Sequence, residues 1–140
     1  GVAPLGYGDP VATEIDFGPN PSNKPITSWF RHLFDVDAAT AADATWLTVS
    51  LRVDDGALVR LNGVELVRVN LPAGTITAST PASTTVSGAA ELSYGEYVVP
   101  ATALLGGWNV LAVEVHQVLP NSSDLAFDLG LSAEVVSDPS

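Results

Sequence analysis

The chain has 140 residues, 46% of them hydrophobic, which suits one domain with a real core. Sixteen acidic residues against five basic ones give a net charge of −11, so nucleic acids and anionic membrane surfaces are excluded as electrostatic partners because their phosphates would be repelled. No run approaches the roughly 20 apolar residues that a membrane-spanning helix requires. The absence of cysteine excludes disulfides and thiolate sites.

Clusters of Gly, Pro, Asn and Ser divide the sequence into short apolar runs, which is typical of an all-β sandwich. The expected strands, in chain order, are residues 12–17, 28–36, 45–53, 57–61, 64–69, 94–99, 108–116 and 125–136. Residues 37–45 and 100–105 are short helical candidates, and residues 71–88 form a long loop with room for one edge strand. We expect a single module over residues 1–136, followed by a tail at 137–140.

The clearest period lies in residues 45–53, where every second residue is apolar. Alternation places on one face Leu47, Val49, Leu51 and Val53. Trp46 then falls on the opposite face. By the same alternation, Trp29 and Trp108 lie off the core faces of their strands. All three tryptophans are therefore predicted to lie outside the main core.

A hairpin is predicted around Asn62-Gly63, because both residues tolerate a positive φ. Just before it, Asp54-Asp55-Gly56 is expected to shape a turn, since Asp side chains accept hydrogen bonds from nearby backbone NH groups. Arg60 is expected to pair across strands with an acid such as Glu65 or Glu114.

Six stretches occur in a recognisable order: "APLGYGD" (3–9), "WFRHLFDV" (29–36), "DDGALVRLNGVEL" (54–66), "RVNLPAG" (68–74), "NVLAVEVHQ" (109–117) and "SSDLAFDLGL" (122–131). Together they resemble the galactose-binding-domain-like β-sandwich modules attached to large secreted bacterial proteins. The resemblance implies a two-sheet antiparallel jelly roll. It also implies sugar binding in some proteins and a purely structural, packing role in others, and both alternatives remain open.

Catalysis is not expected. His32 and His116 are the only histidines, which argues against a histidine-ligated metal centre. No strand–elbow–helix motif such as GxSxG accompanies Ser122, Ser123 or Asp124, so a catalytic triad is not indicated.

Sugar binding needs aromatic platforms for pyranose faces and polar groups for hydroxyls. The predicted sugar-binding residues are Trp29, Trp46, Arg68, Asn70, Trp108, His116 and Gln117. The alternative for each tryptophan is that it covers a sandwich end beneath a loop. Arg68 and Asn70 lie where a strand meets a long loop, a common place for function. His116 and Gln117 end a strand, where they bind a ligand or cap the following loop.

The resemblance also implies a structural calcium that joins the first and last strands. Asp16 and Asp128 are the predicted ligands, with Asp9 and Asp124 as alternatives in loops. No DxDxDG motif supports them, and Asp128 has the alternative of facing solvent.

The sequence thus favours a noncatalytic carbohydrate-binding module that brings an attached enzyme or surface protein to a polysaccharide. The alternative is an interdomain packing module without a glycan ligand. We expect a monomer, secreted or at the bacterial cell surface, whose other partners are domains of the same parent protein. The chain begins at Gly1 without a methionine, as expected for a domain cut from a longer protein.

Overall fold

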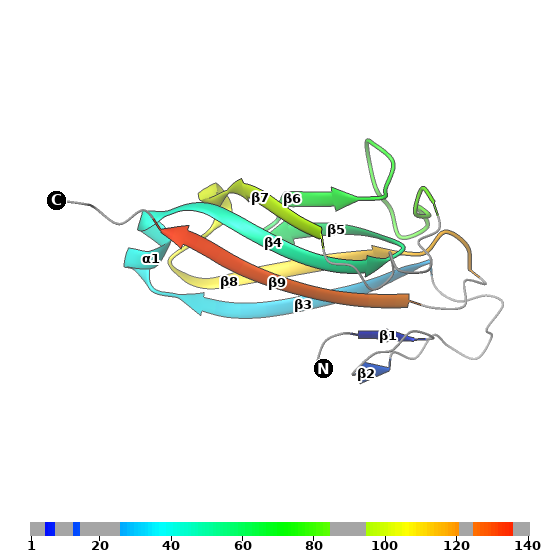
Figure 1. Ribbon diagram of the computed structural model, residues 1–140, viewed down its shortest axis with the longest axis horizontal. Helices are drawn as coiled ribbons and strands as arrows, with labels where there is room; N and C mark the ends of the chain where they lie inside the picture. Colours follow the sequence, from blue (N-terminus) through cyan, green and yellow to red (C-terminus); the bar gives the residue numbers. More distant parts are fainter. Residues whose placement is uncertain (1–4, 8–12, 15–25, 85–94, 121–124, 136–140) are drawn as a thin grey trace.

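The computed structural model describes residues 5–7, 13–14, 26–84, 95–120 and 125–135 (Figure 1). Their elements, in chain order, are β1 (Leu5–Tyr7), β2 (Thr13–Glu14), β3 (Thr27–Val36), α1 (Ala38–Asp43), β4 (Ala44–Asp54), β5 (Gly56–Leu61), β6 (Val64–Val69), β7 (Gly95–Pro100), the 3₁₀ turn η2 (Ala101–Ala103), β8 (Gly107–His116) and β9 (Leu125–Val135). Within these residues, neither short helix has the length or apolar character needed to cross a membrane.

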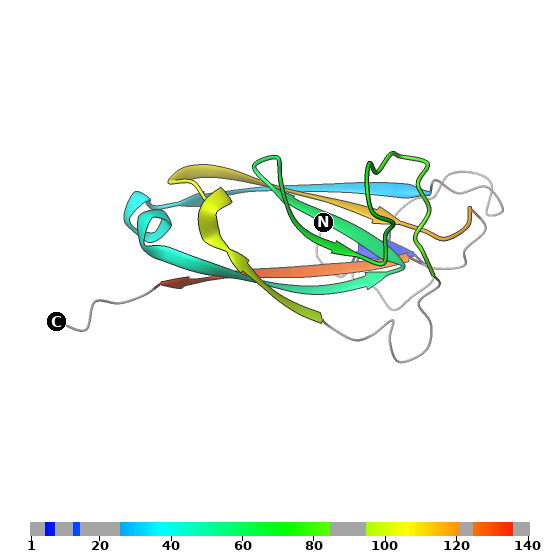
Figure 2. The same cartoon turned by 90° about the horizontal axis from the view of Figure 1, so that it is seen from above.

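The strands form two sheets that pack face to face, which confirms the predicted all-β sandwich. One sheet has five strands in the order β2-β1-β9-β4-β7, and the other has four in the order β3-β8-β5-β6. Figure 2 separates them into two layers, with β3 and β8 in one and β4 and β9 in the other. The pairing is antiparallel, as predicted, with the exception of the short parallel pair β1 with β2.

The core lies between the sheets and follows from strand alternation. Leu47, Val49 and Leu51 of β4 are at most 3% exposed. They meet the inward residues of the opposite sheet, which are Ala57, Val59, Leu61, Val67, Leu111, Val113 and Val115. Burying each large apolar side chain contributes about 1.5–3 kcal/mol, so the two patterned faces stabilise one another.

Strand β3 lies at an edge of the four-stranded sheet and contributes Phe30, Phe34 and Val36 to the core margin. The ring of Phe30 stacks on Phe127 of β9, with centroids 4.7 Å apart. This contact joins the two sheets along the long side where β3 and β9 approach each other (Figure 1).

The β5–β6 hairpin turns at Asn62 and Gly63, whose φ angles of 52° and 83° both lie in the left-handed region. Such a pair of positive φ angles matches the twist of the flanking strands, which confirms the predicted turn. A Cβ added at Gly63 would meet nothing within 4 Å. The position therefore favours glycine for its backbone angle alone.

Asn62 also joins the hairpin to η2 and to the beginning of β8. Its amide Nδ2 donates to Ala103 O and to Asn109 Oδ1, both at 2.8 Å, and its Oδ1 accepts from Val110 N at 2.9 Å. Asn109 is fully buried and bonds both backbone groups of Leu105, each at 2.9 Å. The asparagines of "LNG" and "WNVL" are therefore structural, since they satisfy backbone groups at this end of the sandwich.

Several strands and helices differ in the structure from the ranges predicted from the sequence. The strand predicted at residues 12–17 is described only as β2, and β1 was not predicted because three residues carry no period. The described part of the long loop, residues 71–84, contains no strand. The helical candidate at 37–45 is α1, one and a half turns long, and the turn predicted within 100–105 is η2.

Replacing Gly63 with Val should lower the free energy of unfolding by about 1–3 kcal/mol, because a β-branched residue is strained at φ 83°. Urea denaturation of Gly63→Val and Gly63→Asn checks this. Asparagine tolerates the left-handed region and should cost clearly less than valine. Equal stability of wild type and Gly63→Val would show that the turn is assigned wrongly.

Candidate functional site

The outer face of the four-stranded sheet holds two of the three tryptophans. The side chains that point to it are Thr27, Trp29, Arg31, Leu33 and Asp35 from β3 and Trp108, Val110, Ala112, Glu114 and His116 from β8. The two strands run in register, with Trp29 opposite Glu114 and Asp35 opposite Trp108. Residues 71–84, called here the covering loop, cover the end of this face that carries His116. No segment among the described residues covers the other end, which is called here the bare end.

His116 is fully buried beneath the covering loop. Its Nδ1 donates to Thr80 O at 2.6 Å, since a carbonyl oxygen can only accept. The Thr27 hydroxyl lies 3.1 Å from the same nitrogen and donates to Ala78 O at 2.6 Å. On the other side of the ring, Nε2 lies 3.2 Å from a carboxylate oxygen of Glu114. The imidazole thus links β3, β8 and the loop.

Asn70 fixes the two ends of the covering loop to each other. It adopts a φ of 53°, and its Nδ2 donates to Thr84 O at 2.6 Å and to Asp55 O at 3.2 Å. Its Oδ1 accepts from both the backbone N and the hydroxyl of Thr84, at 3.1 and 2.9 Å. Both polar atoms of this side chain are therefore used within the protein.

Arg68 binds the beginning of the same loop. Its guanidinium donates to Pro72 O at 2.7 Å and to Gly74 O at 2.9 Å. A further contact at 2.8 Å reaches the carboxylate of Glu65. The cation therefore stabilises the turn after β6 through charge-assisted hydrogen bonds.

The loop approaches the sheet so closely that Gly56 has no room for a side chain. A Cβ there would lie 2.7 Å from Asn70 O and 3.1 Å from the Ala82 Cβ. Ala82 N donates to Gln117 O at 2.8 Å, and Gln117 is fully buried. Gly56 is therefore required for the loop to close over β5.

The neighbouring acids belong to this junction as well. Asp54 and Asp55 are 1% and 2% exposed, and a carboxylate oxygen of Asp55 accepts from Val118 N at 3.2 Å. Arg60 pairs with Glu114, as expected from cross-strand geometry. Asp55 and Arg60 thus have structural partners, although the Asp55 carboxylate bonds a backbone NH 63 residues away and not a nearby one as the turn prediction for "DDG" expected.

At the bare end, five residues form what we call the tryptophan strip: Trp29, Arg31, Leu33, Asp35 and Trp108. Trp29 and Trp108 are 62% and 68% exposed, and Leu33 is 56% exposed. The two indoles are separated by six residues of strand, or roughly 20 Å at 3.3–3.4 Å per residue. The strip therefore presents two aromatic rings with charged groups between them.

Trp46 lies on the other side of the molecule. It is 43% exposed on the outer face of the five-stranded sheet, where its neighbours in register are Pro100 and Glu134. All three tryptophans are exposed, as alternation predicts. They occupy two opposite faces, however, so Trp46 cannot share one ligand with the strip.

The predicted polar residues Arg68, Asn70, His116 and Gln117 lie together, but around the covering loop. His116 and Gln117 have no exposed surface, so in this conformation neither reaches a ligand in solvent. Sugar binding by Arg68 and Asn70 stays a prediction. The sequence analysis did not propose Arg31 and Asp35 as site residues, although their parity with Trp29 was the available signal.

The calcium prediction is not tested by the described residues. Asp16 lies outside them, as do Asp9 and Asp124. Asp128 is half-buried on β9, and its neighbour in register on β4 is Arg52. Within the described ranges no group of three His, Asp or Glu side chains could hold a metal ion.

No protein-family model matches the sequence, and no curated protein matches it. Among solved structures, a β-D-mannosidase from Dictyoglomus thermophilum is similar over 64% of this chain, with 13% identity and a TM-score of 0.41. The similar region covers 9% of the mannosidase chain. A likeness at this level assigns neither a fold, a family nor a function, so the galactose-binding-like resemblance remains an interpretation of the sequence.

Replacing Thr27 with Val should release the covering loop, because valine keeps the shape but removes the hydroxyl that bonds Ala78 O. We expect a loss of about 1–2 kcal/mol in unfolding free energy and faster amide hydrogen exchange within residues 71–84. Thr102→Val, at an exposed position in η2, is the control and should change neither quantity. Unchanged amide exchange in Thr27→Val would show that the Thr27 hydroxyl does not hold the covering loop on the sheet.

Proposed function

We propose that the chain is a noncatalytic carbohydrate-binding module whose glycan lies along the tryptophan strip. The observation that carries the proposal is the exposure of Trp29 and Trp108 on one sheet face, in the part that no described segment covers. Exposed indoles of this size are uncommon unless another molecule covers them. Their flat apolar faces suit the apolar faces of pyranose rings.

The charges between the indoles suit sugar hydroxyls. The Arg31 guanidinium can donate several hydrogen bonds to sugar hydroxyls, and the Asp35 carboxylate can accept hydrogen bonds from them. Because Asp35 is the neighbour of Trp108 in register, a ring stacked on this indole would have an acceptor beside it. The spacing of roughly 20 Å between the indoles favours a polysaccharide over a single sugar.

The net charge of −11 favours a neutral glycan, since an acidic polysaccharide would be repelled. The open sheet face implies weak binding at each site, because little ligand surface is enclosed. The proposed role is therefore to hold an attached secreted enzyme or surface protein near its polysaccharide.

A noncatalytic role is supported by the separation of the two histidines. His32 shares the strand parity of Phe30 and Phe34 and is exposed at the side of the sandwich, whereas His116 is buried under the covering loop on the other face of the same sheet. They cannot serve one reaction centre.

Leu33 supports a second candidate function, interdomain packing. It is an exposed leucine between the two tryptophans, and an apolar strip of this kind also suits a neighbouring domain. Under this alternative, Leu33 and the indoles would bind the neighbour and no polysaccharide would bind the isolated module.

Affinity electrophoresis in gels that contain β-glucan, mannan, xylan or galactan separates the two functions. Retardation by at least one neutral polysaccharide is expected, together with weaker retardation by polygalacturonate. Trp29→Ala and Trp108→Ala should each weaken binding about tenfold, which corresponds to ~1.4 kcal/mol of lost stacking.

The matched control is Trp46→Ala, which removes an exposed indole from the opposite face and should leave retardation unchanged. No retardation on any neutral polysaccharide, or an equal loss in Trp46→Ala, would rule out the strip as the glycan site.

A further inference from the structure

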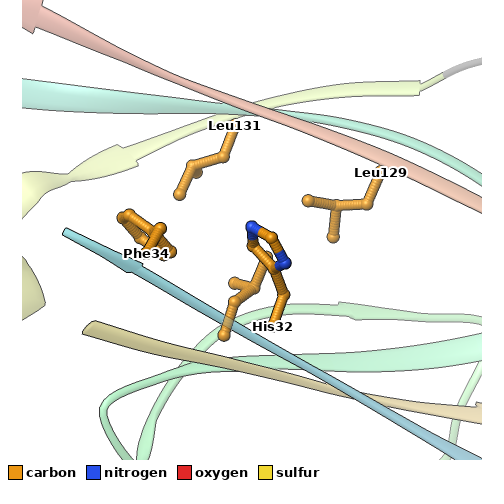
Figure 3. A pocket seen from close by; sticks show the side chains of 5 residues that line it. His32, Phe34, Leu129 and Leu131 are labelled. Carbon is orange, nitrogen blue, oxygen red and sulfur yellow. The ribbon is translucent and has the colours of Figure 1, made fainter. Parts of the chain in front are cut away.

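A cavity of about 330 Å³ that is open to solvent lies at the long side of the sandwich, where β3 faces β9. Its lining residues are His32 and Phe34 from β3, Leu111 from β8, and Leu129 and Leu131 from β9. Figure 3 shows Leu129 and Leu131 pointing from β9 toward β3, with the His32 ring between the two strands. The cavity is separate from the tryptophan strip, which lies on the outer face.

The sheet topology explains why this side is open. β9 pairs with β4 along most of its length, but β1 pairs only with the first three residues of β9, Leu125 to Phe127. Among the described strands, none continues that edge beside Leu129 and Leu131. The Phe30–Phe127 stack closes the core just before this point, and the cavity lies next to it along the strands.

His32 is the unusual residue of the lining. Its position on β3 shares the core-facing parity of Phe30 and Phe34, where an apolar side chain would be expected. The imidazole packs on the Phe34 ring, with centroids 6.1 Å apart and an interplanar angle of 15°. The His32 side chain is exposed to solvent, and no hydrogen bond joins its ring to another residue in the described part of the chain.

The lining selects the chemistry of that ligand. An apolar cavity of about 150 Å³ already holds benzene, and small-molecule sites usually start near 300 Å³ with a few placed polar groups. Four apolar side chains suit an aromatic ring, and one imidazole suits one hydroxyl. The net charge of −11 disfavours a carboxylate.

We propose that this cavity is a binding site for a small neutral phenol, with its ring among Phe34, Leu129 and Leu131 and its hydroxyl hydrogen-bonded to His32. The site does not depend on the glycan-binding function, because the two surfaces share no side chain. It gives the module a second ligand of a different chemical class.

The test uses 4-methylphenol with the intact chain, monitored through the leucine methyl resonances in NMR. The methyl signals of Leu111, Leu129 and Leu131 should shift together, with a dissociation constant on the order of 1 mM. Toluene, which lacks the hydroxyl, should bind several-fold more weakly, and 4-methylbenzoate should bind least.

His32→Phe keeps an aromatic ring at this position and should abolish the preference for 4-methylphenol over toluene. Val98→Ala removes an exposed aliphatic side chain from the outer face of the five-stranded sheet, and as the control it should bind as wild type does. The proposal is overturned if these methyl signals do not shift, or if His32→Phe keeps the full preference for the phenol. Binding mapped to Trp29 and Trp108 instead of the cavity would overturn it as well.

Discussion

The apolar contact between the two sheets is the constraint on which the rest of the structure depends. Each sheet has one apolar face, and neither apolar face is stable in water unless the other covers it. Because strand side chains alternate, closing this contact also decides what remains outside. Val49 and Val113 are buried inside, and the indoles of Trp29 and Trp46 are thereby placed on outer faces.

The outer face of the four-stranded sheet is then divided by the covering loop. At one end, His116, Asn70 and Gly56 allow the loop to lie directly on the strands, and buried polar groups there find partners in it. At the other end no described segment covers the strip, and this difference within one face is the structural basis of the proposed glycan site. A second difference lies at the open long side between the sheets, where the exposed His32 lies beside a mainly apolar cavity.

Turn residues in the sequence were sufficient to predict most strands and the Asn62-Gly63 turn, and alternation was sufficient to predict the core of β4 and the exposure of the tryptophans. Alternation has a limit, however. It could not predict the surroundings of His116 and Gln117, because a strand period assigns a face and says nothing about the segment that covers it. That information lies in hydrogen bonds such as the one from His116 to Thr80, 36 residues apart in the chain. The cavity at His32 was missed for a similar reason, since it results from where β1 stops pairing with β9.

The most direct test is which side chains of β4 point into the core. It is measured by the unfolding free energies of two isosteric substitutions at neighbouring positions. Val49 is fully buried, so Val49→Thr should place a hydroxyl in the core and lower the unfolding free energy by about 1–3 kcal/mol in urea denaturation. Thr48 lies on the outer face, where Thr48→Val should change stability by no more than about 0.5 kcal/mol. A reversed order, or equal losses at both positions, would contradict the sheet packing from which the site and the cavity follow.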